Sequence, residues 1–333
     1  MTNKKAPKNH SEKVLAVTDL KTSFFTKKGL VRAVDGVNFT VDRGEIVGLV
    51  GESGCGKSIT SLSIMRLVPQ PAGKIVAGEV LFKGEDLLQK SDEEMRRLRG
   101  DRISMIMQDP MVSMNQLLTV GYQLGEVFKY HHPGNGGSLR ERCVRLLEKV
   151  KVPSPESRLD DYPFQFSGGM CQRVLIGMGI ANNPDLLIAD EPTTALDVTI
   201  QAQILKLMKD IQRDSGTSII LITHDLAVVA QICTRVLVMY AGRIVEQAPV
   251  LAFYKNPSHP YSVSLIRSVP VLGHRADRLF SIGGQPPNLS NPPPGCRFAP
   301  RCDKVMPICW EKYPPEISIA ENHQISCWLY AQD

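Results

Sequence analysis

The sequence predicts an α/β fold with a parallel sheet and a helical insertion in its middle. Residues 45–50 form an almost continuous apolar run, which is typical of a strand buried on both faces. A glycine-rich turn and a helical segment that begins at Lys57 follow this run directly. From about residue 115 to residue 165 the apolar positions recur with helical spacing. Strand, turn and helix in this order define an α/β unit, and the long helical stretch is inserted into it.

The remaining elements follow from the same patterns. Residues 14–17 are apolar and residues 37–41 alternate with period two, so both are expected to form short strands. Residues 92–100 are charged and are expected to form a helix. Further apolar runs predict strands at 103–107, 186–189, 218–223 and 236–240.

The composition divides the chain in two. Residues 1–253 carry the α/β pattern, with the helical subdomain at about 109–175, and residues 254–333 form an extension. Between 255 and 315 there are twelve prolines, and periodicity fades. We therefore expect the extension to be a loop-rich module with little core of its own.

Bulk composition indicates a globular chain in a reducing compartment. It has 333 residues with 43% hydrophobic and 22% charged residues, ordinary values for a soluble domain. No stretch approaches the roughly 18 apolar residues of a membrane-spanning helix, and residues 1–13 lack the apolar core of a signal peptide. We expect a cytosolic location and reduced cysteines. The net charge of +5 is mild, the basic start is interpreted as a solvated terminus, and no nucleic-acid partner is expected.

Residues 51–58 fit the phosphate-binding loop pattern between a strand and a helix. Its glycines allow backbone N–H groups to converge on an anion, Lys57 supplies a charge for the β- and γ-phosphates, and Ser58 supplies a hydroxyl for Mg²⁺. Cys55 sits at a helix N-terminus, which lowers thiol pKa, so we hypothesise that it reacts with alkylating reagents; the alternative is an inert small residue. The predicted nucleotide-binding residues here are Gly51, Ser53, Gly54, Cys55, Gly56, Lys57, Ser58 and Ile59.

Polar residues at three predicted strand ends complete an ATP site. Asp190 ends the strand at 186–189, where it can hold Mg²⁺, and Glu191 follows it as a candidate general base. Gln108 follows the strand at 103–107, which places an amide near the metal and the water. His224 follows the strand at 218–223, where its imidazole can contact the γ-phosphate.

The segment 166–173, Phe-Ser-Gly-Gly-Met-Cys-Gln-Arg, resembles the signature motif of ATP-binding cassette (ABC) proteins. Asp197 looks like the D-loop residue of that family, and Gln108 and His224 look like its Q-loop and H-switch residues. The resemblance covers roughly residues 14–253. It implies a RecA-like P-loop NTPase core with a helical subdomain, and an ATPase dimer in which Ser167, Gly168 and Gly169 contact ATP held by the opposing subunit.

Two details of the resemblance stay open. An aromatic residue stacks on adenine in this family; we place Phe25 in that role, with Phe24 as the alternative, and either can be a core residue. The signature has Phe166 where Leu is usual and Met170 where Gln is common, and the peptide-importer branch often carries that Met. After the Q-loop, Ser113-Met114-Asn115-Gln116 departs from that branch's usual Ser-Leu-Asn-Pro, in a region that faces the membrane subunits in this family.

The extension resembles that of dipeptide and oligopeptide importer ATPases. The resemblance lies in residues 256–261 (Asn-Pro-Ser-His-Pro-Tyr) and in the residues around its cysteines. In that branch four cysteines are implied ligands of a [4Fe–4S] cluster, here Cys296, Cys302, Cys309 and Cys327. Zn²⁺ is the rival, although zinc ligands usually come in closer pairs. Two disulfides are less favoured in the cytosol. His323 is a possible substitute ligand, but is more often a surface residue. Asp303 stands where Pro is usual.

The resemblance implies an ATP- and Mg²⁺-dependent importer subunit at the cytoplasmic face of the cell membrane. The implied partners are a second ATPase subunit, expected to be a paralogue, two membrane permeases and an external substrate-binding protein. Cargo is expected to be dipeptides, oligopeptides or related compounds such as nickel chelates. The alternatives are a non-transport ABC ATPase of the DNA-repair or translation type, and a catalytically dead regulatory subunit.

Overall fold

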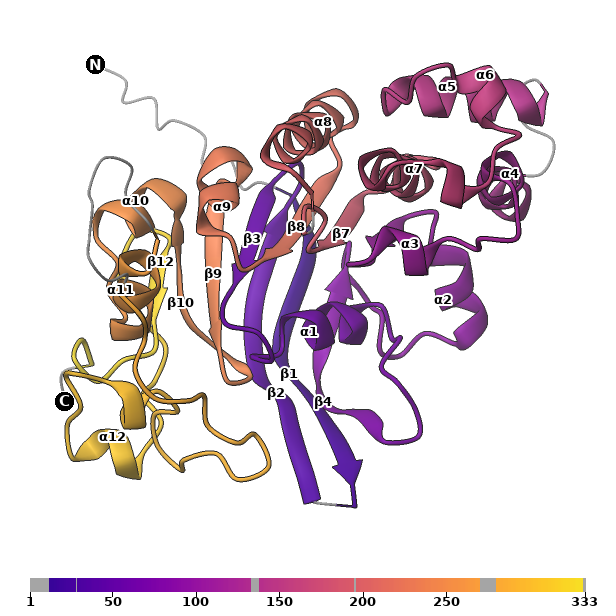
Figure 1. The fold of residues 1–333 in the computed structure, drawn as a ribbon. Helices are drawn as coiled ribbons and strands as arrows, with labels where there is room; N and C mark the ends of the chain where they lie inside the picture. Colours follow the sequence, from indigo (N-terminus) through magenta and orange to yellow (C-terminus); the bar gives the residue numbers. More distant parts are fainter. Residues whose placement is uncertain (1–11, 28, 133–137, 195, 270–279, 332–333) are drawn as a thin grey trace, which may run out of the picture.

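A computed structural model describes residues 12–27, 29–132, 138–194, 196–269 and 280–331. The basic start of the chain lies outside these residues, and so do residues 133–137, where proline and glycine residues interrupt the helical pattern and predict a loop. The fold contains two sheets, with helices packed on them (Figure 1).

The larger sheet has eight strands in the order β11-β12-β10-β9-β3-β8-β7-β6. Its centre is parallel from β9 to β6, and β10, β12 and β11 continue it as antiparallel strands. In sheet order, the strands are β11 (Ile317–Ala320), β12 (His323–Ile325), β10 (Arg243–Pro249), β9 (Arg235–Tyr240), β3 (Ile46–Val50), β8 (Ser218–Thr223), β7 (Leu186–Asp190) and β6 (Ile103–Ile106).

The smaller sheet is antiparallel, with the order β2-β1-β4-β5. Its strands are β1 (Lys13–Thr26), β2 (Gly29–Asp42), β4 (Gly73–Phe82) and β5 (Glu85–Asp86). The predicted strands at 14–17 and 37–41 lie within β1 and β2, but both strands are 14 residues long and not short. Apolar residues of this sheet, such as Val17 and Val80, share one core with Leu49 and Ile188 of the larger sheet.

The helices include the helical insertion that the sequence predicts. They are α1 (Lys57–Ile64), α2 (Asp92–Leu98), α3 (Pro110–Ser113), α4 (Val120–His131), α5 (Leu139–Lys149), α6 (Pro155–Arg158), α7 (Gly168–Ile180), α8 (Val198–Ser215), α9 (Leu226–Ile232), α10 (Val250–Lys255), α11 (Pro260–Arg267) and α12 (Ile308–Glu311), with 3₁₀ turns η1 (Pro163–Gln165) and η2 (Ala299–Arg301). In Figure 1, α4 to α7 lie on the side of the larger sheet where β7 is labelled. The C-terminal part lies at the opposite side, beside β10.

Burial explains why these elements form. Strands β3, β7 and β8 are buried along their whole length, as expected for central strands covered on both faces. Helix α7 is also buried on most sides, because it packs between the sheet and the other helices of the insertion. Helix α8 is amphipathic, with Ile204, Leu205 and Met208 turned inward.

The extension contains more regular structure than its composition predicts. Besides its loops it includes α11 and α12, and β12 pairs with β10 in the larger sheet. Tyr261 and Phe298 of the extension are fully buried in a core that they share with Val50 and Val236 of the larger sheet. The expectation of little independent core agrees with this arrangement; the domain boundary at 253 stays a prediction.

Candidate active site

The phosphate loop joins β3 to α1 and has a conformation that only glycine tolerates at two places. Gly51 has φ 153° and Gly56 has φ 112°. A Cβ on Gly51 would lie 2.1 Å from the Met239 carbonyl oxygen, and one on Gly56 would lie 2.4 Å from that of Ala33. The sequence therefore needs these glycines because neighbouring backbone passes too close for a side chain.

Lys57 is held inside the loop by the loop's own carbonyl groups. Its Nζ donates to the carbonyl oxygens of Gly51 (2.8 Å) and Glu52 (3.0 Å). The buried ammonium thus lies in the concavity formed by the backbone, which is the position expected for a phosphate contact. Ser53 and Gly54 at the tip of the loop are exposed.

Asp190, at the end of β7, is buried beside the start of α1. A hydrogen bond links it to the Ser58 side chain, and burial raises the pKa of its carboxyl. Its Oδ1 has no hydrogen-bond partner among the described residues. A buried carboxylate oxygen without a partner, next to a serine hydroxyl, is a donor set that suits Mg²⁺.

Glu191 is the point on which three polar side chains converge. Its carboxylate accepts hydrogen bonds from Gln108 Nε2 (3.0 Å) and Thr194 Oγ1 (2.9 Å). His224 Nδ1 lies 3.2 Å from its other oxygen. Gln108, Glu191 and His224 follow the neighbouring strands β6, β7 and β8, so the carboxyl ends of a parallel sheet bring them together as predicted.

Local backbone and charge fix the state of Glu191. Its φ of 47° is unusual for a residue other than glycine, and such conformations concentrate at functional sites. Burial raises the pKa of its carboxyl, but the hydrogen bonds from His224 and Thr194 outweigh this effect, so its pKa is lowered overall. Glu191 is therefore ionised at neutral pH and able to accept a proton.

The signature residues and Asp197 serve as helix N-caps. The Ser167 hydroxyl accepts from the Met170 N–H at the start of α7 (3.3 Å), and Asp197 accepts from the Ile200 N–H at the start of α8 (2.9 Å). Both caps are exposed, and so is Gly168. A Cβ on Gly169 would lie 2.7 Å from Ile200, which explains the second glycine. The first N–H groups of α7 thus face solvent, as an anion site requires.

The two aromatic candidates differ in exposure. Phe25 is 54% exposed, and Lys74 Nζ lies 5.8 Å from its ring centroid. Phe24 is half-buried, and its ring packs against Gly73. Phe25 therefore has the free ring face that stacking on a base needs.

The lowered thiol pKa predicted for Cys55 is wrong. The Cys55 side chain is buried, and this burial raises the pKa of its thiol despite the nearby Lys57. The charge of the helix end and the ammonium is too weak to offset the loss of water around a thiolate. Burial and the raised pKa favour the alternative, an inert small residue.

The four cysteines of the extension line one small cavity, together with His259. Burial raises the pKa of the Cys296 thiol to about 11 and that of Cys327 to about 12. No group of three or more His, Cys, Asp or Glu placed to hold a metal ion is found in the described parts of the chain. The eight cysteines are all free thiols, so no disulfide forms.

His323 is neither a member of this cavity nor a surface residue. It is buried, and its Nε2 lies 2.8 Å from Glu246 Oε1 on β10. Both predicted alternatives for His323 are wrong, because pairing of β12 with β10 carries this residue into the interior.

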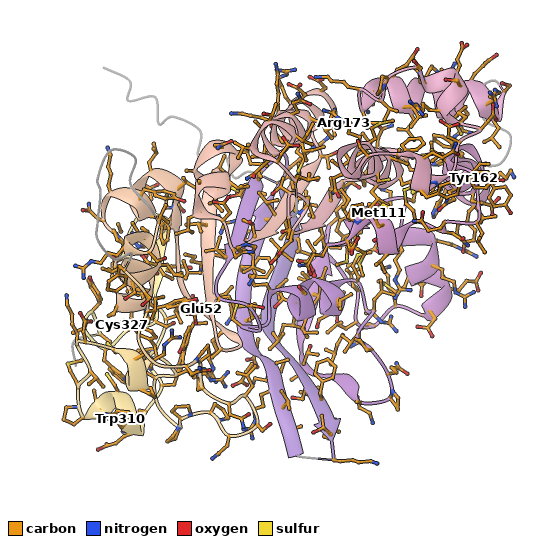
Figure 2. The ribbon with its side chains drawn as sticks, viewed as in Figure 1. Glu52, Met111, Tyr162, Arg173, Trp310 and Cys327 are labelled. Atoms are coloured by element: carbon orange, nitrogen blue, oxygen red, sulfur yellow. The ribbon has the colours of Figure 1, made fainter. Side chains whose placement is uncertain are left out.

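Contacts between the extension and the phosphate loop were not predicted. Arg301 forms a two-point ion pair with Glu52 of the loop (2.7 and 2.9 Å), and the Glu52 N–H donates to the Tyr261 hydroxyl (2.8 Å). In Figure 2, Glu52 lies between the central sheet and the C-terminal part that carries Cys327 and Trp310. Thr194 was missed as well; only its position three residues after Glu191 signals it.

These features define a P-loop nucleotide hydrolase: a phosphate loop between β3 and α1, a buried carboxylate for Mg²⁺ and an ionised glutamate at the same edge of the sheet. Comparisons with known proteins give the particular family. A family model described as ABC transporter matches residues 34–194, and one described as oligopeptide/dipeptide transporter, C-terminal region, matches residues 245–309.

Curated relatives match nearly the whole chain. It is 51% identical over 321 residues to the dipeptide transport ATP-binding protein DppD of Bacillus subtilis (strain 168), with 96% of each chain covered. It is 50% identical over 322 residues to the oligopeptide transport ATP-binding protein OppD of the same organism, covering 96% of this chain and 90% of the relative.

Among solved structures, the fold is similar to the dimeric ATP-binding cassette MJ0796 in a post-hydrolysis state bound to ADP and Pi. The TM-score is 0.64 at 26% identity, over 71% of this chain and 98% of that one. The chain belongs to the family of ABC transporter ATP-binding subunits, in its oligopeptide/dipeptide branch, and it is an ATPase. Across the residues described, no helix combines the length and apolar character needed to cross a membrane.

Proposed function

We propose that this chain hydrolyses ATP to power import of dipeptides or oligopeptides, as one of two ATPase subunits under a pair of membrane permeases. The observation that carries the proposal is the convergence of Gln108, Thr194 and His224 on Glu191 beside the phosphate loop. This arrangement argues against a catalytically dead subunit. The names of the curated relatives support peptides as the cargo, in preference to a non-transport role in DNA repair or translation.

The residues of the site divide the chemistry among them. Backbone N–H groups of residues 51–58 and the Lys57 ammonium bind the phosphates, and Phe25 stacks on the base. Ser58, Asp190 and Gln108 would hold Mg²⁺. The bound ion would neutralise charge that develops on the phosphate oxygens. Glu191 orients the attacking water and accepts its proton at the carboxylate. His224 holds that carboxylate in place and contacts the γ-phosphate.

Two copies of the cassette are needed to complete a site. Ser167, Gly168 and Gly169 begin α7 with exposed N–H groups, and Asp197 caps α8 beside them. We place these residues against the γ-phosphate bound by the opposing subunit. The dimeric state of the similar cassette supports this arrangement. A paralogue is the partner we favour.

An exposed apolar patch near the Q-loop fits contact with the permeases. It consists of Met107, Met111, Val112 and Leu117, of which Val112 and Leu117 are 81% and 85% exposed. Soluble proteins keep such groups scattered, so a cluster indicates a binding surface. Met111 lies on the side of the helical subdomain, away from Cys327 (Figure 2). The chain would then sit at the cytoplasmic face of the membrane, and an external binding protein would deliver the cargo.

Import can be tested in cells that lack the gene, complemented with the wild-type chain, Glu191→Gln or the control Glu148→Gln. Glu148 is an exposed helical glutamate outside the site, so it controls for the loss of one charge. Uptake of labelled dialanine and of a labelled pentapeptide should return with the wild type and Glu148→Gln only. Failure of the wild-type chain to restore either uptake would contradict peptide import.

For the extension, we infer that Cys296, Cys302, Cys309 and Cys327 hold a [4Fe–4S] cluster. The fit rests on four thiols that line one buried cavity, a donor set typical of iron–sulfur clusters. The cluster would supply stability that this proline-rich segment cannot obtain from a core of its own. Protein purified without oxygen should contain about four irons per chain. One zinc and no iron would favour Zn²⁺ instead.

A further inference from the structure

Besides the four cysteines, three side chains with polar groups line the cavity: Lys304, Trp328 and His259, whose imidazole is buried. His259 precedes α11 and is 1% exposed. Its ring packs near Phe298, with the two centroids 5.9 Å apart. The histidine therefore belongs to the wall of the cavity and not to the solvent-exposed surface.

Two hydrogen bonds fix the position of His259. Its backbone N–H donates to Glu246 Oε2 on β10 (2.8 Å). Its Nδ1 accepts a hydrogen bond from the Tyr261 N–H (3.0 Å), so that the side chain caps the start of α11. Because Glu246 also accepts from the Ser258 N–H and contacts His323, the histidine is anchored to the larger sheet.

These contacts determine where the ring proton lies. A ring nitrogen that accepts a hydrogen bond carries no proton, so Nδ1 is unprotonated and Nε2 must be the N–H group. Nε2 is buried, and within the described residues it has no hydrogen-bond partner. A buried donor without a partner destabilises a fold, so we expect a group bound in this cavity to accept this hydrogen bond.

We propose that His259 Nε2–H donates a hydrogen bond to a sulfur atom of the metal group held by Cys296, Cys302, Cys309 and Cys327. The inference rests on the cysteine-bound cluster proposed above. His259 is then a positioning residue and not a ligand, because a nitrogen that carries the proton has no lone pair for a metal. Thiolate and sulfide sulfurs bear negative charge, and this charge increases when a cluster is reduced. The hydrogen bond should therefore raise the reduction potential and slow loss of the metal.

Two substitutions separate this role from helix capping. His259→Asn keeps an acceptor at the position of Nδ1, and Asn is a good N-cap, but it has no donor at the position of Nε2. His259→Gln places an amide N–H near the position of Nε2 and loses the capping geometry. If the donor matters, the Asn variant is impaired and the Gln variant is close to the wild type; if only the cap matters, the order is reversed.

The measurements use the full chain purified without oxygen. Iron content is determined first, then the reduction potential by a titration followed by EPR, and then the rate of iron transfer to a chelator. We expect His259→Asn to have a lower potential and faster iron loss, and His259→Gln to stay near the wild type. A ¹⁵N coupling from labelled histidine in the EPR spectrum of the reduced wild type would show the contact directly.

The outcomes distinguish the two proposals. If the wild type binds iron and His259→Asn has an unchanged potential and release rate, or if Gln is impaired and Asn is not, the inference about His259 is wrong and the cluster stands. If the wild type carries zinc and no iron, the cluster proposal fails. The rate of zinc release to a chelator from the same two variants then shows whether His259 donates the hydrogen bond. Faster release from His259→Asn supports it, and equal rates refute it.

Discussion

We expect the loss of either partner of the ion pair between Arg301 and Glu52 to destabilise the chain, and the loss of Glu52 to cost more than the loss of Arg301. Arg301 belongs to the extension and Glu52 to the phosphate loop, and the Arg301 side chain is 3% exposed whereas that of Glu52 is 26% exposed. The Arg301 guanidinium also donates to the carbonyl of Gly283 (2.8 Å), so little of it is accessible to water. Replacing each partner by Met removes its charge while keeping most of its volume.

The exposures give the expected magnitudes. Glu52→Met leaves a buried guanidinium without its counter-charge, which typically costs about 3–5 kcal/mol. Arg301→Met leaves a carboxylate that can still be hydrated, so we expect about 2 kcal/mol, near the value of a hydrogen bond to a charged group. The double variant removes both charges and should be more stable than Glu52→Met alone.

Chemical unfolding of the full chain measures these differences, with nucleotide absent and present. Arg97→Met is the matched control, because Arg97 pairs with Glu93 on the surface, where both side chains are at least 70% exposed. We expect that control to change the free energy of unfolding by at most about 0.5 kcal/mol. Equal effects of Arg301→Met and Glu52→Met, or a double variant whose loss equals the sum of the two, would refute the reasoning.

Three further predictions concern the active site. Glu191→Gln should keep ATP binding and lose about 10²–10⁴ in turnover, because the water loses its base while the phosphate loop is intact; ATPase rates of the assembled transporter check this, and near-normal turnover would contradict it. Lys57→Ala should weaken nucleotide binding itself by removing the charge that faces the phosphates, which equilibrium titration separates from turnover. Phe25→Ala should weaken ATP binding by about 1–3 kcal/mol through lost stacking; a larger loss in Phe24→Ala, in protein that remains folded, would assign the base to Phe24.

The active site could be predicted because its residues follow a simple rule. Gln108, Asp190 and His224 each stand at or just after the end of a buried apolar strand, and parallel strands place such ends at one edge. The sequence also marks those strands clearly, since a strand covered on both faces has no polar face. Position along the chain was therefore enough to bring these side chains together.

Other features depend on pairings that no local pattern reveals. Arg301 meets Glu52 across 249 residues, and β12 is only three residues long where it joins β10. The reactivity expected of Cys55 followed from its place before a helix, but burial behind the loop has the opposite and larger effect on its pKa. Burial is a property of the folded structure, so the sequence could not predict whether the pKa of the Cys55 thiol is raised or lowered.

The shared core explains how the extension and the phosphate loop are connected. The ring centroids of Tyr240 and Tyr261 lie 4.6 Å apart, and Phe298 packs against both at 5.2 and 5.4 Å. Tyr240 ends β9 beside the strand that leads into the loop, so these aromatic contacts connect the extension to the sheet next to the phosphate loop. Two side chains of the extension form hydrogen bonds with Glu52: Arg301, which precedes Cys302, and Tyr261, which follows His259 by two residues. Single substitutions can remove each of these two contacts with the phosphate loop separately.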